Sequence, residues 1–217
     1  MRFYGQFTPP QDQVLFDTYF RDSPPGVFME CGAFDGVSES SCLFFEESLG
    51  WTGVNIEPVP FVFERLRVNR PKACNIHAAL SDHCGEGRFT HAIHPVHGVW
   101  FGNGSLSHSR AHREDLDTQG CRFESFNVPL ITYREVLRIS GLTRLDLFVL
   151  DVEGHELEAI AGMDGADALP RVLCVEYGMI DVAVLDSRLT ALGYSRDRVV
   201  HNNLVYLRSS PLRRPGA

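Results

Sequence analysis

The densest group of ionisable residues in the sequence follows an apolar run within LDLFVLDVEGHELEAI, residues 145–160. Six consecutive positions there supply Asp151, Glu153, His155 and Glu156. Charged groups this close repel one another, and they lose hydration at the end of a buried strand. Carboxylates and imidazoles take protons from substrates or bind cations. The pattern indicates a catalytic or cation-binding site after this strand, except at Glu156, where the dipole of a helix first turn is the simpler explanation.

A second acidic segment, MECGAFDGVSES at residues 29–40, places glycines between a predicted strand and a predicted helix. Glycine at such a turn lets the backbone approach a nucleotide closely. Only the first glycine fits the G-x-G-x-x-G spacing of a dinucleotide site, and acids here would lie close to a pyrophosphate. S-adenosylmethionine carries positive charge and no phosphate, so neither the missing glycines nor the acids argue against it. The alternative is that this segment forms an ordinary strand-to-helix turn without a ligand. The residues expected to bind this cofactor are Glu30, Gly32, Ala33, Asp35 and Gly36.

Two further predicted strands end in acidic residues. Glu57 in VNIEP lies 21 positions after Gly36, close to the spacing at which an acid binds the ribose of a dinucleotide. A solvated acid at a strand end is the alternative. In AALSDH, residues 78–83, Ser81 and Asp82 follow the next strand, where we expect the adenine. Asp82 can accept a hydrogen bond from the adenine amine, although Ser-Asp also stabilises turns for local reasons.

Strands and helices alternate along the chain, which favours a mostly parallel α/β sheet covered by helices on both faces. Ligands bind such sheets at the carboxyl ends of the strands, so we expect the four acidic strand ends to line one crevice. Residues 94–121 show no clear period and predict a long loop or lid. Within the second helix, Ser38 is the expected start and Gly50 the expected stop. The predicted strands are 26–32, 51–58, 73–82, 87–93 (an edge), 122–132, 145–151, 171–178, 194–200 and 203–208, and the predicted helices are 12–21, 38–50, 59–70, 133–140, 153–162 and 181–192.

Length and composition predict one domain over residues 1–208 and a disordered tail at 209–217. The chain has 217 residues, 44% of them hydrophobic, and a formal net charge of −8 at pH 7, which argues against a nucleic-acid partner. No 18-residue apolar run or signal-peptide pattern occurs, so we expect no membrane span. Six cysteines without C-x-x-C spacing favour reduced thiols in a cytoplasmic protein. The sequence does not decide whether the chain forms a homo-oligomer.

Three of these segments together resemble the FkbM family of S-adenosylmethionine-dependent methyltransferases: ECGAFDG with NIEP, AALSD, and LDLFVLDVEGHELEAIAGM. The resemblance extends over roughly residues 4–177 and is weakest in 94–121. It implies a class I, Rossmann-like methyltransferase fold whose seven-stranded, mostly parallel sheet has helices on both faces and one antiparallel strand. It also implies O-methylation of a hydroxyl on a small molecule or glycan, such as a sugar, glycoconjugate or secondary metabolite.

Methyl transfer to a hydroxyl needs an aligned acceptor and a general base or a metal. Asp151, at the strand end nearest the expected methyl group, is the first candidate for catalysis, with His155 and Glu153 beside it. Asp151, Glu153 and Glu176, which ends the neighbouring strand, form a candidate Mg²⁺ site.

Several alternatives to this assignment stay open. An NAD-dependent oxidoreductase is the rival enzyme, but the second and third glycines of its turn are missing. A non-catalytic nucleotide-binding protein of the same fold is the rival of another class. In the predicted lid, Trp100 and Phe101 can stack on a sugar face or only anchor the loop. His91, His94 and His97 lack a common zinc spacing and are more simply loop residues.

Overall fold

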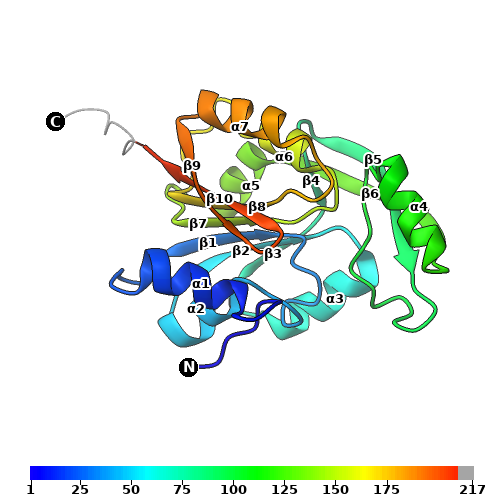
Figure 1. Cartoon of the computed structure of the whole chain (residues 1–217). Helices are drawn as coiled ribbons and strands as arrows, with labels where there is room; N and C mark the ends of the chain where they lie inside the picture. The colour runs from blue at the N-terminus through cyan, green and yellow to red at the C-terminus, as the bar shows by residue number, and fades with distance from the viewer. Residues whose placement is uncertain (210–217) are drawn as a thin grey trace.

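The centre of the molecule is a seven-stranded sheet in the order β3-β2-β1-β7-β8-β10-β9 (Figure 1). A computed structural model describes residues 1–209 of the chain. Strands β3, β2, β1, β7 and β8 are parallel, and β10 is antiparallel to both of its neighbours. The expected seven-stranded, mostly parallel sheet is therefore confirmed. Its strands are β1 Val27–Cys31, β2 Thr52–Glu57, β3 Cys74–His77, β7 Leu147–Leu150, β8 Val172–Glu176, β9 Tyr194–Val200 and β10 Asn203–Arg208.

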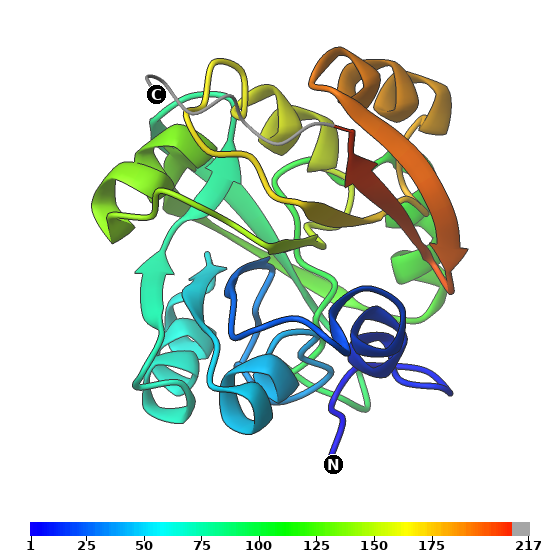
Figure 2. The ribbon, with the colours of Figure 1, turned by 90° about the vertical axis from the view of Figure 1, so that its left-hand side faces the viewer.

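Helices cover both faces of this sheet, with α1, α2 and α3 on one side and α5, α6 and α7 on the other (Figure 2). Strand β7 shows why both faces need cover: Leu147 and Val149 pack towards α1 and α2, and Phe148 and Leu150 pack towards α5, α6 and α7. A strand that buries both faces reads as a continuous apolar run. The helices are α1 Gln11–Leu15, continued by the π-helix Phe16–Phe20, α2 Leu43–Leu49, α3 Pro60–Asn69, α5 Tyr133–Ser140, α6 Glu156–Ala161 and α7 Val182–Ala191.

A second, three-stranded sheet in the order β4-β6-β5 stands beside the first. Its strands are β4 Ala79–Ser81, β5 Gly85–Ile93 and β6 Arg122–Thr132. The prediction of a single strand over 73–82 is wrong, because β3 pairs with β2 in the large sheet and β4 pairs with β6 in the small one. No glycine or proline marks a break within the run, so the two strands are distinguished by their pairing partners. The edge position predicted for β5 is confirmed.

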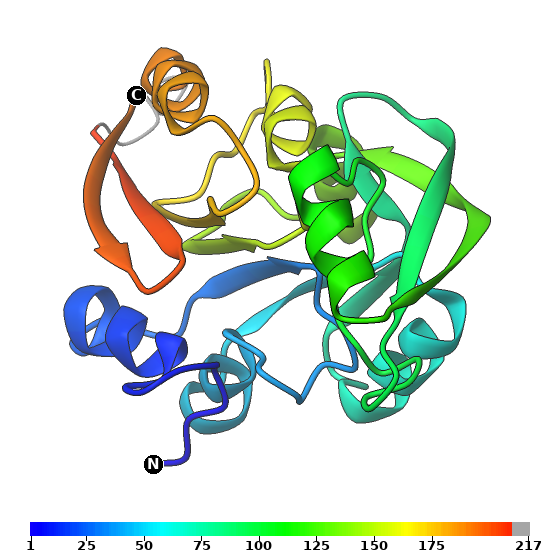
Figure 3. The same ribbon diagram turned by 45° about the vertical axis from the view of Figure 1, so that its right-hand side comes forward.

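The predicted loop 94–121 contains a helix, α4 Arg110–Thr118, that lies along the small sheet (Figure 3). Ser109 caps its first turn by accepting a hydrogen bond from the backbone N–H of His112 at 3.1 Å. His112 and Leu116, four positions apart, are its buried residues, and Leu116 packs against Ala92 of β5. The expectation of an irregular segment is wrong for this part.

The ends of α2 correct one expectation and confirm another. The helix begins at Leu43, where the hydroxyl of Ser40 accepts a hydrogen bond from the backbone N–H of Leu43 at 3.1 Å. Ser38 is not its cap, because it bonds to Asp35 in the preceding turn. Gly50, with φ of 68°, ends the helix as predicted.

Three further expectations concern the cysteines, membrane-spanning helices and the C-terminal tail. All six cysteines, which lie within residues 1–209, are free. No helix in the same range combines the length and the apolar character that a membrane crossing requires. Of the predicted tail, residues 210–217 lie outside the described residues.

Candidate active site

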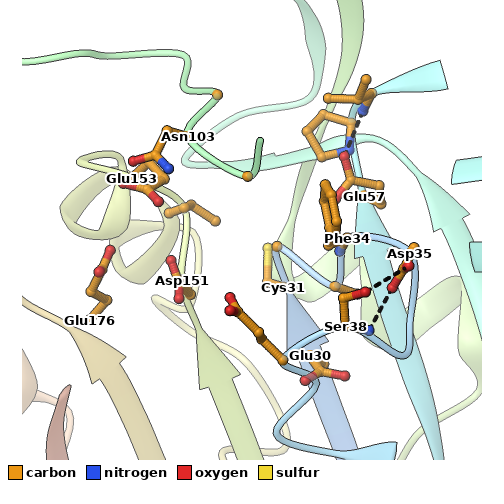
Figure 4. A pocket seen from close by; sticks show the side chains of 18 of the residues that line it. Glu30, Cys31, Phe34, Asp35, Ser38, Glu57, Asn103, Asp151, Glu153 and Glu176 are labelled. Atoms are coloured by element: carbon orange, nitrogen blue, oxygen red, sulfur yellow. Dashed lines mark hydrogen bonds between the residues drawn. The ribbon is translucent and has the colours of Figure 1, made fainter. Parts of the chain in front are cut away.

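A cavity of about 800 Å³ opens where β1, β2, β7 and β8 end (Figure 4). Its lining unites most of the predicted site residues, namely Glu30, Gly32, Ala33, Asp35, Glu57, Asp151, Glu153, His155 and Glu176. Gly36, Ser81 and Asp82 do not belong to the lining as residues 1–209 form it. The convergence predicted from the sequence therefore exists at Glu30, Glu57 and Asp151. At the third strand end, Ala79 and Leu80 line the cavity, whereas Ser81 and Asp82 do not.

Gly32 brings the strand-to-helix turn into direct contact with the backbone of Asp151. Its φ is 78°, and a Cβ atom at this position would lie 1.8 Å from the carbonyl oxygen of Asp151. Only glycine fits there. The turn is closed by Asp35, whose Oδ1 accepts hydrogen bonds from the backbone N–H groups of Val37 at 2.9 Å and Ser38 at 2.7 Å. Gly36 serves packing instead, since its Cα faces the side chains of α3.

Glu30 is buried in a charged network below the turn. Its carboxylate accepts hydrogen bonds from the Ser40 hydroxyl at 2.8 Å and from the backbone N–H of Ser41 at 2.6 Å. The guanidinium of Arg70, fully buried, lies 3.5 Å from Glu30 and 2.8 Å from Glu46. Burial raises the pKa of Glu30, and Arg70 opposes that rise. Glu30 thus holds the turn against the start of α2 as well as lining the cavity.

Glu57, the last residue of β2, joins the glycine turn after β1 to the segment that follows β2. Its Oε2 accepts a hydrogen bond from the backbone N–H of Phe34 at 3.0 Å, and its Oε1 accepts one from that of Val59 at 2.8 Å. Burial raises the pKa of Glu57 to about 7. Each carboxylate oxygen has a second lone pair, so Glu57 can still accept hydrogen bonds from two hydroxyls in the cavity.

Asp151, Glu153 and Glu176 form a three-carboxylate cluster at the other side of the cavity. One oxygen from each lies within 4.8 Å of one from both others. Oε1 of Glu176 accepts a hydrogen bond from the Asn202 amide at 2.7 Å, whereas its Oε2 is buried with no partner among residues 1–209. No other three-member group suited to a metal occurs in that range, so the histidines of the lid do not form one.

Burial and mutual repulsion disfavour the charged forms of this cluster. Burial, followed by the charge of Glu176, raises the pKa of Asp151 well above its usual range. Burial, followed by Asp151, does the same to the pKa of Glu153. Burial, followed by Glu153, raises the pKa of Glu176 to about 8. A cation among these three groups would relieve the repulsion.

His155 connects the lid to the small sheet. Its Nδ1 shares a hydrogen bond with the Ser107 hydroxyl at 2.8 Å, and its Nε2 shares one with the Ser81 hydroxyl at 3.1 Å. Burial lowers the pKa of His155. Ser81 therefore contacts the site through His155. Asp82 is about half-exposed and bonds to the ring of His83 at 2.6 Å, a contact that lowers the pKa of Asp82.

Sequence reasoning missed His112 of α4, which reaches the carboxylate cluster. Its Nε2 lies 3.9 Å from Oε2 of Glu153, and its Nδ1 is buried with no partner among residues 1–209. The sequence carries a helix signal here, with Ser109 as a cap and His112 and Leu116 four positions apart, but this signal spans only two helical turns.

The cavity has two chemically different ends, which Figure 4 shows on opposite sides. Glu57 and Phe34 lie at one end, and Asp151, Glu153 and Glu176 lie at the other. Apolar and aromatic side chains gather near Glu57, since Val59 and Phe89 pack in one cluster with Phe34 and the ring of Trp100 meets that of Phe34 edge-on. One end thus suits a flat apolar group and the other suits a cation or an exchangeable proton.

Comparison with known proteins gives one match to a family. The family model described as the methyltransferase FkbM domain matches residues 30–195, about three quarters of the chain. No curated protein matches the chain.

Solved structures with a similar fold include two methyltransferases. The methyltransferase FkbM from Methylobacillus flagellatus KT superposes with a TM-score of 0.54 at 13% identity, over 87% of this chain and 46% of that one. The chain therefore spans about half the length of that protein. The METTL16 methyltransferase domain gives a TM-score of 0.50 at 11% identity, over 92% of this chain and 66% of that one.

Proposed function

The chain belongs to the FkbM methyltransferase family, and from that membership we propose that it is an S-adenosylmethionine-dependent O-methyltransferase. The proposed acceptor is a hydroxyl of a sugar, glycoconjugate or secondary metabolite. The observation that carries the proposal is the polarity of the cavity, with an apolar end beside Glu57, a carboxylate end at Asp151 and a glycine turn between them.

The residues present fit this cofactor. Gly32 keeps the floor of the cavity free of a side chain where two strands end, Glu57 offers acceptors for ribose hydroxyls, and the carboxylate end favours positive charge. When bound, S-adenosylmethionine supplies a methyl group on a positively charged sulfur. We assign Glu30 and Ala33 to the wall beside its amino acid part, and Asp35, which Figure 4 shows near Phe34 and Glu57, to the ribose end. Asp82 stays a prediction, since it would have to leave His83 to reach an adenine.

Asp151 is the residue we propose as the general base. It follows β7 directly, and its carbonyl meets the glycine turn, so its side chain lies beside the expected methyl position. Holding a hydroxyl next to that carboxylate orients the nucleophile and accepts its proton. Glu153 supports Asp151 from the cluster. His155 positions the lid, because both ring nitrogens are engaged by serines.

We further propose that the cluster Asp151, Glu153 and Glu176 holds a divalent cation such as Mg²⁺. Carboxylate oxygens are the ligands that Mg²⁺ prefers, and the buried Oε2 of Glu176 has no other partner among residues 1–209. A cation there supplies positive charge that lowers the pKa of a nearby hydroxyl.

A labelled-methyl transfer screen against hydroxyl acceptors, with Mg²⁺ or with EDTA, tests both proposals. Asp151→Asn should lower transfer at least about 100-fold while S-adenosylhomocysteine still binds in calorimetry. Asp167→Asn is the matched control, because Asp167 is an exposed acid outside the cavity lining. Normal turnover by Asp151→Asn would refute the assigned base, and unchanged turnover in EDTA would refute the cation.

A further inference from the structure

Trp100 is a partly exposed aromatic residue held in a fixed position at the cavity. It is 41% exposed and belongs to the cavity lining. The rings of Phe34 and Phe61 meet it edge-on, with centroids 6.3 and 5.7 Å away. The guanidinium of Arg65 lies over its ring, 4.8 Å from the centroid. Three side chains, one from the glycine turn and two from α3, therefore fix an indole whose surface stays partly accessible.

This indole lies at the apolar end of the cavity. Its neighbour Phe34 donates its backbone N–H to Glu57, the residue proposed to bind ribose. Phe34 also packs against one buried apolar cluster, which includes Val59, Ala79 and Phe89. A group attached to the ribose would therefore meet apolar side chains and the indole on which Arg65 is stacked.

The lid segment that carries Trp100 is tied down near this residue. The ring of His91 in β5 bonds to the carbonyl oxygen of Val99 at 2.9 Å, one position before Trp100. Further along the lid, Ser107 bonds to His155. The indole is thus placed by contacts on both sides and does not depend on a ligand to order it.

We propose that Trp100 stacks on the adenine of the cofactor and closes the apolar end of the cavity over the adenosyl group. This inference rests on the proposed function. Aromatic side chains bind the faces of nucleobases, each contact contributing about 1–3 kcal/mol. A sugar acceptor also stacks on indoles, but the proposed acceptor lies beside Asp151, which Figure 4 shows across the cavity from Phe34, the neighbour of Trp100.

Intrinsic fluorescence tests the proposal, because the chain has two tryptophans. Trp51, the other one, is 3% exposed and packs against Phe20 and Phe45. S-adenosylhomocysteine and 5′-methylthioadenosine should change the emission of the wild type, and methionine should not. In Trp100→Phe the emission comes from Trp51 alone and should not respond to either ligand.

Calorimetry gives the matching affinities. Trp100→Ala should weaken S-adenosylhomocysteine binding roughly 5- to 100-fold, and Trp100→Phe should restore most of the loss. If the wild type binds S-adenosylhomocysteine but position 100 changes neither emission nor affinity, the role of Trp100 is refuted and the proposed function stands. A neutral sugar that changes the emission in place of 5′-methylthioadenosine also refutes it. If the wild type binds no S-adenosylhomocysteine, the proposed function falls as well.

Discussion

Glu57 makes cofactor affinity depend on pH, with a size and direction that follow from its environment. Burial raises its pKa from 4.5 to about 7, which corresponds to about 3 kcal/mol. Because the folded pKa lies above the unfolded one, this group's contribution to stability is fully present below pH 4.5 and is lost as pH rises through 7. Above neutral pH the charged form of Glu57 is therefore unfavourable in the folded protein unless a ligand stabilises it.

Ribose hydroxyls donating to Glu57 would stabilise its charged form and return its pKa towards 4.5. Binding then releases about one proton near pH 6, and S-adenosylhomocysteine should bind roughly 50- to 100-fold more weakly at pH 5 than at pH 8. Calorimetry in buffers of different ionisation enthalpy measures both quantities. In Glu57→Gln this component of the pH dependence should disappear. Equal affinity at both pH values in the wild type, or an unchanged slope in Glu57→Gln, would refute the ribose contact.

Two further predictions concern the fold that supports the site. Gly32→Ala should destabilise the protein by about 3 kcal/mol or more, because its Cβ would overlap the carbonyl oxygen of Asp151. The control Gly50→Ala should cost only about 1–2 kcal/mol, since Gly50 has a φ of 68° but nothing within 4 Å of its Cβ. Equal losses of unfolding free energy in urea would contradict the close approach at Gly32. Arg70→Met should lower the free energy of unfolding by about 3–5 kcal/mol, since it leaves Glu30 and Glu46 buried without their cation. The control Arg67→Met, which removes an exposed pair with Glu64, should change it by less than about 1 kcal/mol. A similarly small loss for Arg70→Met would exclude a structural role for the buried ion pairs.

The parts of the fold that could be predicted from sequence are those in which local pattern and burial agree. Strand β7 was recognisable because it buries both faces. The end of α2 was recognisable because glycine adopts the positive φ of a helix end more readily than other residues. The division of 73–82 could not be predicted, because β4 pairs with residues 130–132, about fifty positions away. Helix α4 was missed because tertiary contacts of His112 and Leu116 stabilise a short and largely polar segment.

The same limit applies to the site. Alternation of strands and helices placed the carboxylates at one edge of the sheet, but distances among them depend on backbone detail. Glu153 adopts a φ of 57° and Gly154 one of 100°, which turns the chain so that Glu153 reaches Asp151 and Glu176. The two serines that engage His155 come from distant parts of the chain, so its ring could only be predicted as free.

Charge balance gives the clearest reason for a cationic ligand. The described lining of the cavity holds seven acidic residues and one arginine. That arginine, Arg65, lies on the indole of Trp100, away from Asp151 and Glu176. Buried carboxylates without a cation are strongly unfavourable, so a cationic ligand would stabilise Asp151, Glu153 and Glu176, which have no cationic side chain beside them in the described lining. The proposed divalent cation and the sulfonium of the proposed cofactor would both bring that charge, and a neutral analogue of the same shape would gain less binding free energy from this cavity.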